Sequence, residues 1–163
     1  MTDIDPNRVV ENDMPTQKEF KLNLERAIEI AANAHAGQVD KANQPYILHP
    51  IRVMLAVHSE KERLAAVLHD VVEDTPITFD DLENERFPKD VIDAVRALTK
   101  LDGESRIEAA SRAAQDPIAR VVKLADVADN MDISRIPNPT EKDHARLREY
   151  ADVREILLKG NDR

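Results

Sequence analysis

The chain has 163 residues, no cysteine, and 32 acidic against 23 basic residues, so its formal net charge at pH 7 is −9. This length suits one domain with a single core, the absence of cysteine excludes disulfide and thiolate chemistry, and the acidic balance argues against nucleic-acid binding through a basic surface. No apolar run reaches the roughly 18–20 residues that span a bilayer, and the acidic N-terminus lacks an apolar signal core, so we expect no membrane partner and a cytoplasmic location.

The sequence predicts an all-α fold, a bundle of about eight helices. The chain contains only three glycines and little β-branched alternation, which argues against a sheet. Capping signals such as Ser59 with Glu62 precede the periodic apolar segments. Helices are expected near residues 16–36, 49–57, 60–73, 78–85, 88–100, 105–115, 117–131 and 140–158. We expect residues 1–15 to form a loose N-terminal arm and residues 16–160 to form the domain.

Four ionisable residues interrupt the apolar face of the helix expected over 60–73, in the segment LAAVLHDVVEDT. Because residues four apart share one face of a helix, His69 lies above Glu73 and Asp70 lies above Asp74. Crowding carboxylates beside a core costs free energy unless a cation or another partner compensates. The alternative is a solvated polar face with one hydrogen-bonded histidine.

Similar groups recur on two other expected helices. His49 lies in the segment PYILHP, directly before the final proline. Asp126 stands beside the apolar stripe of the helix expected over 117–131. With His69 and Asp70 they supply two imidazoles and two carboxylates, a mixture that suits manganese, iron or zinc with positions left open for water. Buried metal sites in helical folds are commonly built from facing helices in this way.

Five segments, in this order, resemble the HD superfamily of metal-dependent phosphohydrolases, and within it the hydrolase domain of RelA/SpoT-type alarmone enzymes and their small relatives. The segments are AHAGQ at 34–38, PYILHP at 45–50, HDVVED at 69–74, LTK at 98–100 and KLADVADNM at 123–131. The resemblance implies an HD-domain helical bundle. It also implies removal of the 3′-pyrophosphate from guanosine tetra- or pentaphosphate, a small-molecule nucleotide substrate, with manganese as the usual metal.

The resemblance also assigns roles to individual residues. Four match the metal ligands of the family: His49, His69, Asp70 and Asp126. Glu73 and Asp74 match the pair that orients or activates the attacking water. Three match residues around the substrate: Lys41, Tyr46 and Asn130. For Tyr46, packing beneath the His49 loop is an equal alternative to contact with the substrate.

Three positions depart from the family pattern. Asp40 stands where the family carries an arginine, and Val127 and Asp129 replace an arginine and a histidine. We therefore expect the metal ligands to be intact and part of the nucleotide-facing shell to be changed. Two alternatives follow: an HD-type nucleotidase acting on another nucleotide, and a nucleotide-binding regulatory module with weak turnover. The sequence does not give the oligomeric state.

Two further residues have competing interpretations. His35 stands near the end of its helix before a glycine, where capping or core hydrogen bonding is favoured over metal ligation. Lys123 either reaches the substrate or pairs with a nearby carboxylate.

Overall fold

A computed structural model describes residues 17–160, with side chains from residue 24 onward. The expected N-terminal arm, residues 1–15, and the helix start at Thr16 lie outside the described residues. Within them the chain is helical, and its only β-type pairing is an isolated bridge between Val39 and Pro45. The all-α prediction is confirmed.

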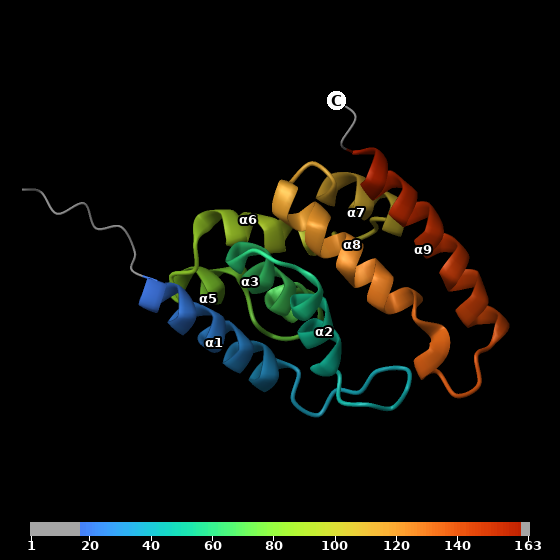
Figure 1. The fold of residues 1–163 in the computed structure, drawn as a ribbon, viewed down its shortest axis with the longest axis horizontal. Helices are drawn as coiled ribbons and strands as arrows, with labels where there is room; N and C mark the ends of the chain where they lie inside the picture. Colours follow the sequence, from blue (N-terminus) through green and yellow to red (C-terminus); the bar gives the residue numbers. More distant parts are fainter. Residues whose placement is uncertain (1–16, 161–163) are drawn as a thin grey trace, which may run out of the picture.

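The described residues form nine α-helices and one short 3-10 helix (Figure 1). The first five α-helices are α1 (Gln17–Ala34), α2 (Leu48–Ala56), α3 (Glu60–Leu68), α4 (Val71–Asp74) and α5 (Phe79–Asn84). They are followed by α6 (Lys89–Leu98), α7 (Arg106–Ala113), α8 (Pro117–Met131), the 3-10 helix η1 (Ile133–Arg135) and α9 (Glu141–Lys159). None of these helices is long and apolar enough to cross a membrane.

Local capping sets where several helices begin. Four Ser or Thr residues accept the backbone N–H three residues on while an acidic side chain returns to the cap: Ser59, Thr78, Ser105 and Thr140. Asp116 caps α8 by accepting from the N–H groups of Ile118 and Ala119, and Pro117 takes the first helical position. These starts agree with the sequence prediction.

The helix expected over 60–73 is interrupted at the His-Asp pair, which is the main difference from the prediction. The Nδ1 atom of His69 donates to the carbonyl of Ala66 at 2.6 Å. A continuous helix would give that carbonyl to the N–H of Asp70. The helix therefore stops after Leu68, and α4 starts again at Val71.

Two hydrophobic cores lie on opposite sides of α8, which crosses the middle of the molecule (Figure 1). The larger core joins α8 to α1, α2, α3 and α6. The smaller core joins α7, α8 and α9 through the buried residues Ala110, Val127, Val153 and Leu157. The expectation that position 127 faces the nucleotide is wrong, because the Val127 side chain is fully buried in this smaller core.

Candidate metal centre and substrate cavity

Four side-chain atoms from three parts of the fold converge beside α8. The His49 Nε2 atom lies 3.2 Å from Asp126 Oδ1 and 3.6 Å from Asp70 Oδ2. The His69 Nε2 atom lies 3.0 Å from Asp70 Oδ2 and 3.7 Å from Asp126 Oδ1. Ligand atoms bound at about 2.1 Å to one cation lie about 3.0–3.4 Å apart at octahedral to tetrahedral angles. The spacing of the four atoms is therefore close to that of a single metal-ion site.

Hydrogen bonds orient both imidazole rings toward this point. His69 Nδ1 donates to the Ala66 carbonyl at 2.6 Å, and His49 Nδ1 donates to Asp129 Oδ2 at 2.7 Å. Because carbonyl and carboxylate oxygens only accept, each Nδ1 carries a hydrogen and each Nε2 is left for the cluster. Among the described atoms, His69 Nε2 is buried and makes no hydrogen bond of good geometry, although Asp70 Oδ2 lies 3.0 Å away. Such an atom is unusual in a folded protein, and a bound cation would satisfy it.

The two carboxylates are also held in place. Asp126 Oδ1 accepts from Asn130 Nδ2 at 2.6 Å, and Asp126 Oδ2 accepts from Lys123 Nζ at 2.8 Å. The interpretation of Lys123 as the partner of a carboxylate is confirmed. Tyr46 donates its hydroxyl to Asp70 Oδ2 at 2.6 Å. Asn130 and Tyr46, expected at the substrate, thus contact two of the candidate ligands directly.

The electrostatics of the cluster favour a bound positive charge. Burial opposes ionisation of Asp126, but Lys123 and the two histidines hold the pKa of that carboxyl well below its usual range. Burial likewise opposes the charge on Asp70, yet His69 lowers its pKa to about 2. Burial opposes protonation of His69, but Asp70 and Asp126 raise its pKa well above its ordinary value. The buried Asp126 and the partly buried Asp70 therefore carry negative charge that a proton on a histidine or a metal ion can balance.

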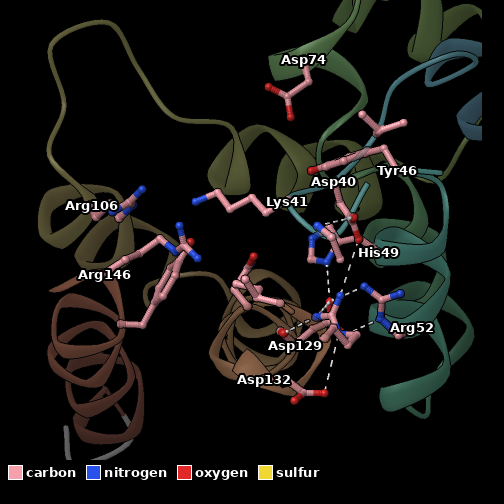
Figure 2. Close-up of a pocket in the computed structure, with 16 residues that line it drawn as sticks. Asp40, Lys41, Tyr46, His49, Arg52, Asp74, Arg106, Asp129, Asp132 and Arg146 are labelled. Carbon is pink, nitrogen blue, oxygen red and sulfur yellow. Dashed lines mark hydrogen bonds and ion pairs between the residues drawn. The ribbon is translucent and has the colours of Figure 1, made fainter. Parts of the chain in front are cut away.

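A cavity of about 600 Å³ opens beside His49, and a second cavity of about 210 Å³ adjoins it and contains Asp70 and Asp126. The two cavities share five lining residues: Tyr46, His49, Arg106, Asn130 and Tyr150. Figure 2 shows Lys41 extending across the larger cavity toward Arg106 and Arg146. One side of the larger cavity thus carries three basic side chains, although Arg106 pairs with Glu149, Arg146 pairs with Asp143, and four aspartates also line the cavity.

The two residues expected to act on water line these cavities. Glu73 lines the smaller cavity, and its Oε2 atom accepts from the backbone N–H of Lys100 at 2.9 Å. Asp74 lines the larger cavity, and its carboxylate points into that space (Figure 2). Burial, with the charges of Asp70 and Glu73, raises the pKa of Asp74 above its ordinary value. A carboxyl with a raised pKa is suited to accept and return a proton.

The sequence profile of the HD domain matches residues 27–134 of the chain, which cover the whole cluster. The chain belongs to the HD-domain family. This family assignment implies a divalent metal. The donor atoms of His49, His69 and Asp70 lie within 4.8 Å of one another, which fits such an ion, and Asp126 Oδ1 lies beside both imidazoles. The predicted resemblance is confirmed.

Known HD-domain proteins of the RelA/SpoT type are similar to this chain. The probable GTP pyrophosphokinase of Mycobacterium leprae is 36% identical over 163 aligned residues, covering 89% of this chain and 20% of the relative. The bifunctional (p)ppGpp synthase/hydrolase SpoT of Escherichia coli is 33% identical over 140 residues, covering 77% of this chain and 20% of the relative. The chain thus spans about a fifth of the length of these curated relatives.

A solved structure is also similar to this chain. It is described as a metazoan ortholog of SpoT that hydrolyses ppGpp, and it matches with a TM-score of 0.69 and 28% sequence identity. The match covers 90% of this chain and 86% of the other. The similarity therefore extends over nearly the whole helical bundle.

Asp40 has a structural role in the loop between α1 and α2 of this HD domain. Its Oδ1 atom accepts from the backbone N–H groups of Ala42 and Gln44 at 2.8 and 2.9 Å. Its Oδ2 atom lies 3.7 Å from Arg135 Nη1. The carboxylate thus organises the loop that carries Lys41, while still lining the larger cavity.

Several residues of the site were not identified from the sequence. Asp129 holds His49, and three basic residues line the larger cavity from elements distant in the sequence: Arg52, Arg106 and Arg146. Asp129 follows Asp126 by one helical turn, a spacing that could have indicated its role. Arg106 and Arg146 stand in charged segments with no distinguishing pattern, and Arg52 is a single charge in the apolar segment PIRVML. His35 is buried and its Nδ1 atom contacts Gln38 Oε1 at 2.8 Å, which confirms the interpretation of core hydrogen bonding.

Proposed function

We propose that this chain is a metal-dependent phosphohydrolase that removes the 3′-pyrophosphate from guanosine 3′,5′-bis(diphosphate), giving GDP and pyrophosphate. One observation carries the proposal: the donor atoms of His49, His69 and Asp70 converge within metal-binding distance, with Asp126 beside both imidazoles and basic residues on one side of the adjoining cavity. The names of several relatives describe this reaction, for example the guanosine-3′,5′-bis(diphosphate) 3′-pyrophosphohydrolase of Aquifex aeolicus, 32% identical over 120 residues.

The proposed metal ligands are His49, His69, Asp70 and Asp126. Two nitrogen and two oxygen donors suit manganese, with iron(II) and zinc as alternatives. When bound, such a cation supplies Lewis-acid polarisation of the phosphoryl group and lowers the pKa of the attacking water. The cavity beside the ligands leaves room for both water and a phosphate.

Glu73 and Asp74 are proposed to orient the attacking water and to move its protons. The backbone N–H of Lys100 fixes one oxygen of Glu73 and leaves the other available. The raised pKa of Asp74 lets this carboxyl take a proton from water and return it to the leaving group. No residue is required to form a covalent intermediate with the phosphate.

The basic side of the larger cavity is proposed to bind the phosphates of the nucleotide. Lys41, Arg106 and Arg146 line one cavity from the α1–α2 loop, α7 and α9 (Figure 2). A volume of about 600 Å³ lies in the range of small-molecule sites. The protein as a whole repels anions at its net charge of −9, so these cations and the metal supply the local attraction. Tyr46 and Asn130 are proposed to border the substrate while they hold Asp70 and Asp126.

A second candidate is hydrolysis of a nucleotide with another base. Asp40 favours this second candidate, because it stands where the family resemblance expects an arginine. Its carboxylate instead accepts hydrogen bonds from its own loop and lies near Arg135. We further propose that residues 16–160 act as one domain and that the protein works in the cytoplasm.

A nucleotide panel tests the proposal. Protein freed of metal and reloaded with Mn²⁺ is given ppGpp, pppGpp and adenosine 3′-phosphates, and the release of pyrophosphate and of orthophosphate is measured separately. The proposal predicts pyrophosphate from the guanosine compounds, abolished by chelator. Release from adenine nucleotides alone would favour the second candidate, and binding without any release would favour a regulatory module.

A further inference from the structure

We infer that Asp129 is a positioning residue of the metal centre, which orients His49 and increases its affinity for the cation. This residue stands where the resemblance expects a histidine, so the arrangement is a property of this chain. The inference rests on the metal site of the proposed function, and its test is designed to separate the two.

The contact between Asp129 and His49 is direct and shielded from solvent. The Oδ2 atom of Asp129 accepts from His49 Nδ1 at 2.7 Å, between residues 80 positions apart in the chain. The two side chains are 12% and 7% exposed. The opposite ring nitrogen of His49 lies 3.2 Å from Asp126 Oδ1. The imidazole thus bridges the Asp129 carboxylate and the cluster.

A carboxylate on the far side of a histidine acts on the metal in two ways. It fixes the tautomer and the ring plane, and its negative charge makes the metal-facing nitrogen a stronger donor. His69 is held differently, because its Nδ1 atom donates to the neutral carbonyl of Ala66. The two imidazoles of the centre therefore differ in the group that accepts from Nδ1, a charged carboxylate for His49 and a neutral carbonyl for His69. His49 is the more strongly polarised of the two.

Two arginines hold Asp129 itself. Arg52 donates to both of its oxygens, at 2.6 and 3.0 Å, and Arg135 donates to its backbone carbonyl at 2.7 Å and to Oδ2 at 3.2 Å. These bonds fix the carboxylate so that Oδ2 meets His49 in a defined direction. They also provide a control, because Arg135 still holds the backbone carbonyl and Oδ2 of Asp129 when Arg52 is removed, and the contact between Asp129 and His49 stays in place.

The test measures the dissociation constant of Mn²⁺ with metal-free protein, without any substrate. Asp129→Asn keeps the size of the side chain and is expected to weaken binding about 10- to 100-fold. Arg52→Met removes a positive charge near the cation and should bind Mn²⁺ as tightly as the parent or more tightly. Asp132→Asn, which removes a carboxylate that contacts only Arg135 in this network, should stay within about threefold.

The ring nitrogens of His49 supply a second readout. In 15N NMR spectra of the metal-free protein, Asp129→Asn should change the ring-nitrogen signals of His49 and leave those of His69 unchanged. Two results would overturn this inference alone. One is an Asp129→Asn variant whose dissociation constant for Mn²⁺ lies within threefold of the parent's. The other is an Arg52→Met variant that loses as much affinity for Mn²⁺ as Asp129→Asn. A parent protein that binds no Mn²⁺ would overturn both this inference and the proposed function.

Discussion

Each candidate metal ligand is held by a neighbour that does not itself belong to the cluster. Ala66 holds His69, Tyr46 holds Asp70 and Lys123 holds Asp126. Holding the ligands in advance lowers the entropic cost of assembling a site around the cation. Residues that hold ligands and residues that act on water should therefore give different defects when they are changed.

The carboxylates expected to act on water can be separated from the metal site. Glu73→Gln with Asp74→Asn should retain bound Mn²⁺ and lower kcat about 10²- to 10⁴-fold, because amides cannot accept the proton of water. Metal content by elemental analysis and kcat for pyrophosphate release are measured together. An unchanged kcat would show that both are only surface carboxylates, and loss of the metal would place them among its ligands.

Asp40 tests how charge in the cavity affects nucleotide binding. Asp40→Asn keeps an oxygen that can accept from Ala42 and Gln44 and removes the negative charge beside the cavity. KM for an anionic nucleotide should fall about 2- to 5-fold, the size expected of a partly solvated charge. Asp93→Asn removes one charge at an exposed position of α6 and should leave KM unchanged. A KM equal to that of the parent would show that Asp40 serves only its loop.

At the scale of elements, one ion pair holds the loop between α6 and α7, because Glu104 in that loop pairs with Arg112 in the last turn of α7. Arg112 on α7 donates to both oxygens of Glu104, at 2.9 and 2.8 Å, and to the carbonyls of Ala97 and Thr99. Glu104 also accepts from the N–H of Leu101 at 2.8 Å. This network fixes the loop that carries Lys100 beside Glu73, so it connects stability to the site.

Glu104→Gln should lower the free energy of unfolding by about 1 kcal/mol at pH 7. Hydrogen bonds to charged groups contribute more to stability than neutral ones by about that amount. Arg112 lowers the pKa of Glu104 to about 2, below an unfolded value of about 4.3. The stabilisation is therefore complete above about pH 5 and is lost as the pH falls from about 4 toward 2. Urea unfolding at several pH values checks this. Asp102→Asn serves as the control. A Glu104→Gln variant that is as stable as the parent at pH 7 would contradict the prediction.

Helix positions could be predicted from the sequence because their signals are local. The Ser59 cap, for instance, needs only its own segment. The break at His69 could not be predicted, because it depends on a side-chain bond to the Ala66 carbonyl. The burial of Val127 depends on how α9 packs against α8. Motifs pointed to the residues that converge at the cluster, whereas the cavity arginines come from helices whose arrangement is set by tertiary packing.

At the scale of the whole molecule, α8 belongs to both cores and carries Asp126 between them. A cation bound at the cluster should therefore stabilise the whole fold. At a free Mn²⁺ concentration of 100 times Kd, the free energy of unfolding should rise by about 2.7 kcal/mol, or about 5–11 °C in Tm for a chain of this size. Calorimetry with and without chelator measures the shift. An unchanged Tm at saturating Mn²⁺ would argue against a site that links the helices.

The most direct test of the account is to titrate metal-free protein with Mn²⁺ while measuring pyrophosphate release from ppGpp. We predict that the rate rises linearly to a break at about one metal ion per chain. His69→Ala, which removes one of the two buried imidazoles of the cluster, should show neither binding nor release. Full activity without metal, or no pyrophosphate at one bound Mn²⁺ per chain, would contradict a metal-dependent pyrophosphohydrolase.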